Sequence, residues 1–218
     1  MDAFEFRRDR YESFRQYQNP LLNLSVVAKL PEFRTYCKER QLPVFHFMLY
    51  CLCMSVKDID NFLYREFEGA VIKIDRFYGG YTVINQDNNL NYANFDISED
   101  RAEFIARSVA AGELARTTRE LINTGHDLSP REQKNNVYTT CMPWLDLRAI
   151  EHPIYEYKTA DIPLIAWGRY SDLAGDTMSV PFCIQAHHGF VDGYHVHLLL
   201  QRLAERIERE ITVCKTGT

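Results

Sequence analysis

The sequence predicts an α+β fold. Short runs rich in β-branched and aromatic residues and longer apolar helical patterns follow one another without strict alternation. A chain of 218 residues is long enough for one well-buried domain and short for two. Its 46% of hydrophobic and 25% of charged residues are typical of a globular protein. We therefore expect a single domain over residues 1–218, built around a packed core.

The first half of the chain predicts two helices followed by strands. Pro31 opens a short helical pattern that ends near Gln41, and Pro43 opens a second. This second pattern, VFHFMLYCLCMSVKD, is apolar on nearly every face, so we expect a central, buried helix. The runs NFLYREF and AVIKID, joined at Glu68–Gly69, predict strands, as does YTVINQ after the tight turn expected at Gly79–Gly80.

The second half predicts a surface helix, three strands and a C-terminal helix. Asp100 followed by Glu103 resembles a helix N-cap, and apolar spacing predicts a helix from Arg101 to Ile122. The polar stretch NTGHDLSPREQKNN predicts a loop with a solvated His126. Strand patterns follow in VYTTCMPW, PLIAWGRY and TMSVPFCIQAHH, the last two joined by a turn at residues 173–176. YHVHLLLQRLAERIERE carries a helical apolar stripe.

Charge and hydropathy exclude several classes of partner. The formal net charge of −5, with arginines scattered among acidic residues, argues against nucleic acid. No uncharged apolar run approaches about 18 residues, and the charged N-terminus lacks a secretory apolar region. We expect a cytoplasmic protein that does not enter a membrane. The six cysteines form no CxxC pair, so we expect buried thiols, no disulfide framework and no metal site.

The stretch HHGFVDGYH, residues 187–195, is the strongest candidate for chemistry. A strand pattern delivers His187 and His188 into a loop, where side chains are held rigidly and stay accessible to a ligand. Imidazole has an unperturbed pKa of about 6.5, so near neutral pH it can take a proton from a hydroxyl and return it later. Strand neighbours point to opposite faces, so one histidine of the pair can enter a given pocket. Asp192 can secure the loop or pair with a cation.

A structural role for the two histidines, at the end of a strand, is the alternative that the motif HHxxxDG disfavours. The other histidines are weaker candidates. His195 and His197 lie about 200° apart on the predicted helix, so they cannot share a ligand and we expect structural roles. His46, in the buried helix, is more typical of a hydrogen-bonded core histidine than of a metal ligand.

The chain resembles the chloramphenicol acetyltransferases, whose hallmark HHxxxDGxH leads into a C-terminal helix. FRRDRYESFRQY, LPVFHFMLY, MPWLDL, IPLIAWGRY and VPFCIQAHHGFVDGYHV occur in that family's order and at similar spacing, over nearly the whole chain. HHxxxDG alone is less specific, because it also occurs in dihydrolipoyl acyltransferase cores, condensation domains and plant acyltransferases. The resemblance implies the CoA-dependent acyltransferase fold, a two-layer arrangement of a mixed β-sheet with helices packed on one face.

The resemblance also implies an assembly and a reaction. It implies a homotrimer whose active sites are tunnels between subunits, with CoA entering from one end and the acceptor from the other. His188 would be the general base that deprotonates the acceptor hydroxyl for direct attack on the acetyl-CoA thioester, and Asp192 would pair with Arg7. By itself, Arg7 would be one more surface charge.

On the CoA side, the resemblance places Arg40 and Arg169 at the two basic positions that contact the CoA phosphate, with Tyr170 adjacent. A guanidinium can hold a phosphate through two parallel hydrogen bonds. Without the resemblance, each arginine would be interpreted as a solvated surface charge.

The resemblance fails at two hydroxyl positions. The family's serine that donates to the oxyanion of the tetrahedral intermediate corresponds to Ala149, and a threonine that helps through water corresponds to Ala166. Loss of one oxyanion donor costs about 10²–10³ in rate. Four residues are near enough in sequence to replace the serine, and the sequence does not place them: Thr139, Thr140, Asp146 and Arg148.

The acceptor side also departs from the family. Its aromatic pair after the first arginine becomes Ser13 and Phe14, and a further apolar contact becomes Gln18. A more polar lining suits a more polar acceptor. Three hypotheses stay open: an antibiotic-resistance O-acetyltransferase acting on chloramphenicol, an acyltransferase for a different and more polar small-molecule acceptor, and a CoA-binding homologue with little turnover.

Overall fold

The structure is a computed structural model that describes residues 4–155 and 160–216, with side chains as far as residue 213. Nine strands are described: β1 (Leu21–Pro31), β2 (Tyr64–Phe67), β3 (Ala70–Lys73), β4 (Tyr78–Ile84), β5 (Leu90–Asp96), β6 (Asn136–Cys141), β7 (Leu164–Trp167), β8 (Ser171–Leu173) and β9 (Thr177–His187). The helices are η1 (Glu5–Arg7), α1 (Arg8–Phe14), α2 (Phe33–Glu39), α3 (Val44–Lys57), η2 (Asp60–Phe62), α4 (Arg101–Thr117), α5 (Pro130–Gln133) and α6 (Gly193–Thr216).

One mixed sheet forms the first layer of the fold. Its strand order is β1-β9-β7-β6-β4-β5, and β8 also pairs with β9. β6 runs parallel to both β4 and β7, and the other pairs in this sheet are antiparallel. β2 and β3 make a separate hairpin. The predicted α+β class with a mixed sheet is confirmed.

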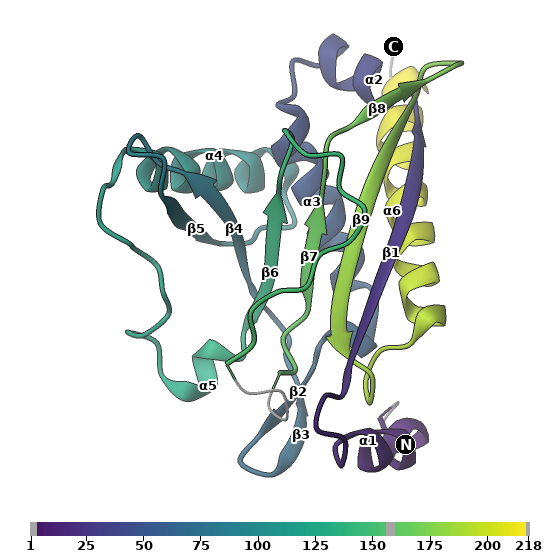
Figure 1. The fold of residues 1–218 in the computed structure, drawn as a ribbon. Coiled ribbons are helices and arrows are strands. Elements are labelled where there is room, and N and C mark those ends of the chain that lie inside the picture. The colour runs from purple at the N-terminus through teal and green to yellow at the C-terminus, as the bar shows by residue number, and fades with distance from the viewer. Residues whose placement is uncertain (1–3, 156–159, 217–218) are drawn as a thin grey trace.

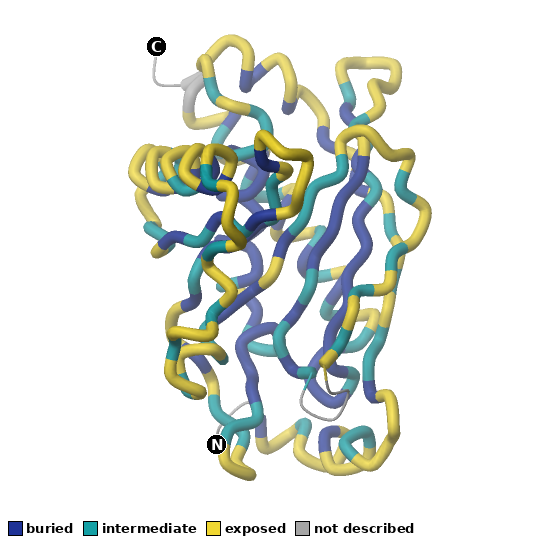
Figure 2. The backbone as a smooth tube through the Cα atoms, turned by 60° about the vertical axis from the view of Figure 1, so that its left-hand side comes forward, coloured by how far each residue is buried: buried dark blue, intermediate teal, exposed yellow. Residues whose placement is uncertain are grey.

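Helices α3, α4 and α6 form the second layer, on one face of the sheet (Figure 1). Side chains of β9 alternate between the two faces, as a strand requires. Val180, Phe182 and Ile184 belong to the core that the helices cover, whereas Cys183 and Gln185 point to the other face. Figure 2 shows that the strands of the sheet are buried over much of their length while α4 exposes its outward side. The predicted two-layer architecture, with helices on one face, is therefore confirmed.

Strand β9 spans the length of the sheet and carries the histidine motif at its end. It pairs with β1 from Pro31 opposite Thr177 to Leu21 opposite His187. β1 is the outermost strand on this side of the sheet. The motif loop therefore leaves the sheet at one end, beside α1, and turns directly into α6 (Figure 1).

The glycine pair at residues 79 and 80 corrects the sequence prediction. Both glycines lie inside β4, not in a turn before it. A Cβ atom at Gly79 would lie 2.5 Å from the ring of Phe95, and one at Gly80 would lie 2.7 Å from Asn94 Oδ1. These glycines are therefore explained by the close approach of β5, which is a reason for glycine inside a strand.

Other elements also differ from the predictions. The helix expected to reach Ile122 ends at Thr117, because the Asn91 side chain binds the backbone of the segment that follows, including the carbonyl of Thr118. The predicted loop contains α5, which a capping box between Ser129 and Glu132 stabilises. Helix α1 and strands β1, β5 and β8 were not predicted from the sequence.

Within the described residues, no helix is both long enough and apolar enough to cross a bilayer. The described thiols at residues 51, 53 and 183 are buried and unpaired, as predicted. His46 Nδ1 bonds to Ser108 Oγ at 2.8 Å between α3 and α4, so it is a hydrogen-bonded core histidine.

Candidate active site

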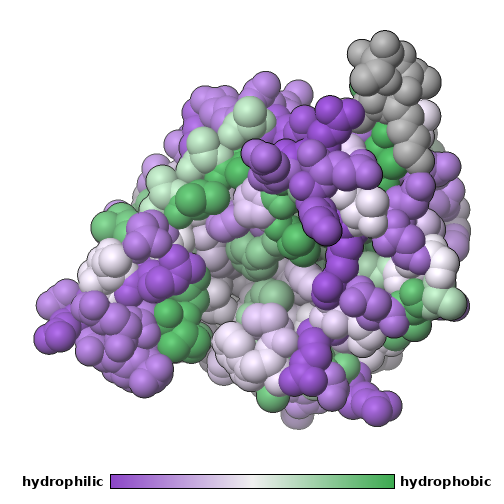
Figure 3. Space-filling view, turned by 90° about the horizontal axis from the view of Figure 1, so that it is seen from above, coloured by the Kyte–Doolittle hydropathy of each residue, from purple (hydrophilic) through white to green (hydrophobic). Residues whose placement is uncertain are grey.

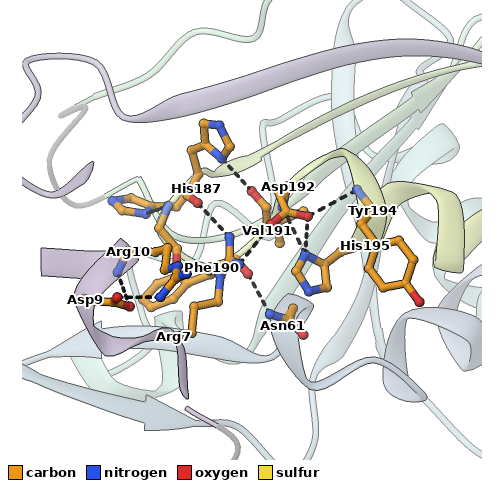
Figure 4. A network of polar contacts seen from close by, with 12 residues as sticks. Arg7, Asp9, Arg10, Asn61, His187, Phe190, Val191, Asp192, Tyr194 and His195 are labelled. Carbon is orange, nitrogen blue, oxygen red and sulfur yellow. Dashed lines mark hydrogen bonds and ion pairs between the residues drawn. The ribbon is translucent and has the colours of Figure 1, made fainter. Parts of the chain in front are cut away.

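Arg7 holds the motif loop through three hydrogen bonds. Its Nη1 lies 2.9 Å from Asp192 Oδ2, its Nε donates to Gly189 O at 2.9 Å, and its Nη2 donates to His188 O at 3.0 Å. Figure 4 shows Arg7 reaching across to the loop from the N-terminal segment. The Arg7–Asp192 pair that the resemblance implies is present. Because the guanidinium also binds two loop carbonyls, it fixes the backbone on which His188 stands.

Asp192 directly precedes α6 and is held by the first turn of that helix as well as by Arg7. Its Oδ1 accepts from Tyr194 N–H at 3.1 Å. His195 Nδ1 lies 3.1 Å from Asp192 N and 2.9 Å from Asp192 Oδ1, so it can bond to Asp192 in either tautomer. Partial burial acts to raise the pKa of Asp192, but His195 and Arg7 outweigh it and lower that pKa. Asp192 is thus an ionised anchor of the loop, and His195 has the structural role that we predicted.

His188 is presented with one ring nitrogen already bonded. Its Nδ1 lies 3.1 Å from Val191 O, and since a carbonyl oxygen can only accept, Nδ1 carries the hydrogen. The lone pair of the neutral ring is then on Nε2. Phe14 stacks on the ring with 4.1 Å between centroids, which fixes the ring plane. This geometry matches what a general base requires, namely one tautomer and one orientation.

His187 points to a different environment from its neighbour. It is 2% exposed, and its Nδ1 accepts from Gly189 N–H at 3.0 Å. Its ring packs against the stacked pair Tyr11 and Phe190, and burial lowers the pKa of His187 to about 4. The two neighbours therefore have different surroundings, as expected: His187, the last residue of β9, supports the loop from inside, and His188, in the turn that follows, has the more accessible ring.

Of the acceptor residues predicted near α1, only one lies against His188. Phe14 lies against His188, but Ser13 is exposed on α1 and Gln18 is exposed after it. No described contact joins Ser13 or Gln18 to the motif loop.

The predicted CoA residues lie beside the other half of β9. Arg169 is exposed, donates to Trp144 O at 2.6 Å and lies 3.5 Å from Asp146 Oδ1. Trp167 Nε1 donates to Tyr170 OH at 3.0 Å, which positions the tyrosine beside Arg169. Arg40 is exposed at the end of α2, the helix that follows β1.

One chain does not bring His188 and the predicted CoA residues together. Gly168 N donates to Pro181 O at 3.1 Å, so Arg169 lies level with Pro181 of β9. At about 3.3 Å per residue, the stretch from Pro181 to His188 spans roughly 20 Å. The described arrangement thus separates His188, Arg7 and Asp192 from the second group, Arg40, Arg169 and Tyr170.

A cavity of about 570 Å³ lies on the sheet face that the helices leave open. It is formed by β4, β5 and β6 together with segments 121–128 and 150–153, and its described lining does not include His188. Its lining mixes apolar and polar side chains, among them Tyr92, Asn94, Tyr138, Thr140, His152 and Leu164. Seen from above, the surface of the molecule is mostly hydrophilic, with apolar residues gathered in a central hollow (Figure 3).

The two alanines that replace the family's hydroxyl residues are placed differently. Ala166 is fully buried in β7, where it pairs with Thr140 on one side and Cys183 on the other. Ala149 is exposed in the segment after β6, next to Ile150 of the cavity lining. Neither residue supplies a hydrogen-bond donor from its side chain.

The comparison with protein families decides the relationship. The family described as chloramphenicol acetyltransferase matches residues 2–204. The chain belongs to the chloramphenicol acetyltransferase family. Its curated relatives include Chloramphenicol acetyltransferase 3 of Escherichia coli, 20% identical over 91% of both proteins. A Bacillus pumilus chloramphenicol acetyltransferase is 21% identical over 95% of this chain and 92% of that protein.

Solved structures show the same fold. A chloramphenicol acetyltransferase superimposes with a TM-score of 0.83 at 19% identity, over 92% of this chain and 94% of that one. A dihydrolipoamide acetyltransferase of Azotobacter vinelandii superimposes with a TM-score of 0.64 at 13% identity, over 94% and 87% of the two chains. Membership of the chloramphenicol acetyltransferase family, together with this fold, supports an acetyl-CoA-dependent acyltransferase.

The cavity lining is the part of the candidate site that sequence reasoning missed. Its residues come from separate strands, and no short motif joins them. His126, which we predicted to be solvated, is exposed as expected and also lines the cavity. Alternating polar and aromatic residues in LNYANFD were the available signal for β5.

Proposed function

We propose that this protein transfers the acetyl group of acetyl-CoA to a hydroxyl group of a small-molecule acceptor. The observation that carries the proposal is the state of His188, whose Nδ1–H is held by Val191 O and whose Nε2 is left as the basic atom. In the family as the sequence resemblance describes it, this histidine is the general base.

The proposed reaction follows from that single lone pair. Nε2 of His188 takes the proton of the acceptor hydroxyl while the hydroxyl oxygen attacks the thioester carbon. The carbonyl electron pair moves to the carbonyl oxygen, which becomes an oxyanion. When the carbonyl re-forms, the carbon–sulfur bond breaks, and the thiolate of CoA takes the proton back from the imidazolium. Acetyl ester and free CoA are the products, and no acetylated enzyme is formed.

We further propose that the complete site lies between chains of a homotrimer. In one chain, the lining of the described cavity includes Thr140 and His152 but not His188. A base delivered by one subunit into the cavity of the next would complete the site. The same arrangement would bring Arg40, Arg169 and Tyr170 to the CoA phosphate end of the tunnel. Each subunit would be a single-domain chain, and the trimer would work in the cytoplasm.

The acceptor follows from the cavity lining. Aromatic and aliphatic side chains suit an apolar part of the acceptor, and Asn94, Thr140 and His152 offer polar contacts beside them. We therefore propose an acceptor that is more polar than chloramphenicol, with chloramphenicol itself as the reference compound. The competing proposal is that the protein binds CoA but transfers acetyl groups slowly, because Ala149 and Ala166 lack the hydroxyl groups that stabilise the oxyanion in the family.

The test follows release of free CoA thiol from acetyl-CoA, with and without chloramphenicol and a panel of polar hydroxylated compounds. We expect acceptor-dependent thiol release that falls by about 10²–10⁴ in His188→Ala, the usual contribution of a general base. The Phe14→Leu variant, which keeps an apolar contact on the ring, should retain more activity than His188→Ala. Equal rates in the wild type and His188→Ala would overturn the proposed role of the imidazole. Tight acetyl-CoA binding without turnover of any acceptor would favour the competing proposal.

A further inference from the structure

Two threonine hydroxyls meet on the sheet face that forms the cavity. Thr82 of β4 and Thr140 of β6 both line the cavity and are both half-buried. Their Oγ1 atoms lie 2.5 Å apart and share a hydrogen bond. Each hydroxyl has one hydrogen to donate and lone pairs to accept with. Because the shared bond uses one of the two hydrogens, the pair keeps one hydrogen for a third oxygen atom.

The register of the sheet places this spare hydrogen next to the missing threonine. Thr140 pairs with Ala166 across β6 and β7. Neighbouring strands lie about 4.8 Å apart, so the Thr140 side chain stands roughly one strand spacing from that of Ala166. Both face away from the helices, because Ile165 and Trp167 on either side of Ala166 belong to the core that the helices cover, and Thr140 lines the cavity. A hydroxyl absent from β7 is therefore present on the adjacent strand, on the same face.

The structure also separates Thr140 from the other candidates. Thr139 is 5% exposed, and its Oγ1 already donates to Gly80 O at 2.7 Å. Asp146 carries a carboxylate, which accepts hydrogen bonds, and it lies against Arg169. Arg148 is exposed outside the described cavity lining. Among these four residues, Thr140 has both the position and the spare donor.

We propose that Thr140, oriented by Thr82, donates a hydrogen bond to the oxyanion of the tetrahedral intermediate and so replaces the hydroxyls absent at Ala149 and Ala166. This inference rests on the acetyl transfer proposed above. The negative charge appears on the former carbonyl oxygen when the acceptor attacks, and it disappears when the carbon–sulfur bond breaks. A donor fixed before the reaction stabilises that charge without having to reorganise.

The pairing of the two hydroxyls adds a second expectation. An anionic oxygen near Thr140 selects the orientation in which Thr82 donates to Thr140 and Thr140 donates to the oxyanion. Hydrogen bonds in such a chain polarise and strengthen one another. Loss of the Thr82 hydroxyl should therefore weaken catalysis, but less than loss of the Thr140 hydroxyl, which touches the charge directly.

The experiment compares Thr140→Val, Thr140→Ser and Thr82→Val by thiol release from acetyl-CoA with chloramphenicol as the acceptor. Valine has nearly the shape of threonine and removes only the hydroxyl. We expect the kcat of Thr140→Val to fall by about 10²-fold, with a KM for acetyl-CoA within about twofold of the wild type. Thr140→Ser, which keeps the hydroxyl, should recover most of the rate. Thr82→Val should lie between the two, and it reports on the same pair should Thr140→Val fold poorly.

The outcomes separate this inference from the proposed function. If His188→Ala is inactive while Thr140→Val keeps a kcat within about threefold of the wild type, the role of Thr140 is wrong and the acetyl transfer stands. A fall of the same size in Thr140→Ser also overturns the inference, because a hydroxyl in place would then not be enough. If the wild type releases no thiol with chloramphenicol or with any hydroxylated acceptor of the panel, both proposals fail together.

Discussion

At the scale of single residues, the two adjacent histidines have opposite surroundings. His188 is stacked on Phe14 at the edge of the motif loop, whereas His187 is enclosed by aromatic rings. Burial lowers the pKa of His187 to about 4, well below the value of about 6.5 in an unfolded chain. Burial of the His187 ring therefore lowers the stability of the folded protein at low pH.

This difference predicts a pH dependence of stability. Between about pH 6.5 and pH 4 the unfolded chain binds a proton at His187 that the folded chain does not, so stability falls as the pH falls. From pH 8 to pH 5 the loss from this residue is about 2 kcal/mol. In His187→Gln, urea unfolding should show a loss between the same two pH values that is smaller by that amount. Equal losses in the two proteins would show that His187 does not keep its low pKa.

The residue scale also shows what the sequence predicted and what it did not. HHGFVDGYH identified the loop, and the resemblance supplied Arg7, whose three bonds to that loop the structure displays. The choice of Thr140 over Thr139 could not be made from the sequence. Both residues line the cavity, and only the structure shows that the Thr139 hydroxyl already donates to Gly80 O, whereas Thr140 pairs with Thr82.

At the scale of elements, long apolar patterns were predicted well and edge strands were missed. The sequences of α3 and β9 are long apolar runs, because both elements are buried on most sides. β1 has apolar residues at alternate positions, with Leu24, Val26, Ala28 and Leu30 toward the core, but the exposed Val27 interrupts the pattern. This period of two was the signal available. β5 was less accessible to prediction, because its buried Asn91 is explained only by its bonds to the segment after α4.

The packing of α4 on β4 gives a prediction at this scale. A Cβ atom at Gly112 would lie 2.1 Å from the hydroxyl oxygen of Tyr81, which itself donates to Ser108 O at 2.7 Å. We expect Gly112→Ala to lower the free energy of unfolding by about 1–3 kcal/mol, the usual cost of overpacking. In a Tyr81→Phe background the nearest atom is gone, so the same substitution should cost less in urea unfolding. Identical costs in both backgrounds would exclude this contact as the cause.

At the scale of the whole molecule, the candidate residues lie in three separate places in the fold. The proposed base, His188, follows the end of β9, the predicted CoA arginine Arg169 lies level with Pro181, and the cavity lies over β4, β5 and β6. The motif HHGFVDGYH indicated His188, and Arg169 was implied by the family resemblance. The sequence did not predict the cavity, because residues distant in the chain meet there only through the strand order.

A mixing experiment tests whether chains share their sites. His188→Ala removes the base, and Leu164→Trp fills the cavity, so each variant alone should be inactive. If the base of one subunit serves the cavity of the next, co-refolding equal amounts should restore about a quarter of the wild-type activity by random assortment in a closed ring. Separately refolded proteins that are mixed afterwards are the control. No recovery after co-refolding would place the base and the cavity of a working site in the same chain.

The strand order also fixes a sequence of events during synthesis. β1 emerges from the ribosome early, but the partner that its register requires, β9, lies near the other end of the chain. At about 5–20 residues per second, β1 waits on the order of ten seconds for that partner. Until then, the unpaired backbone N–H and C=O groups of β1 can bond to an extended segment of another chain. We therefore expect the N-terminal part of the protein to need protection from aggregation until β9 has been made.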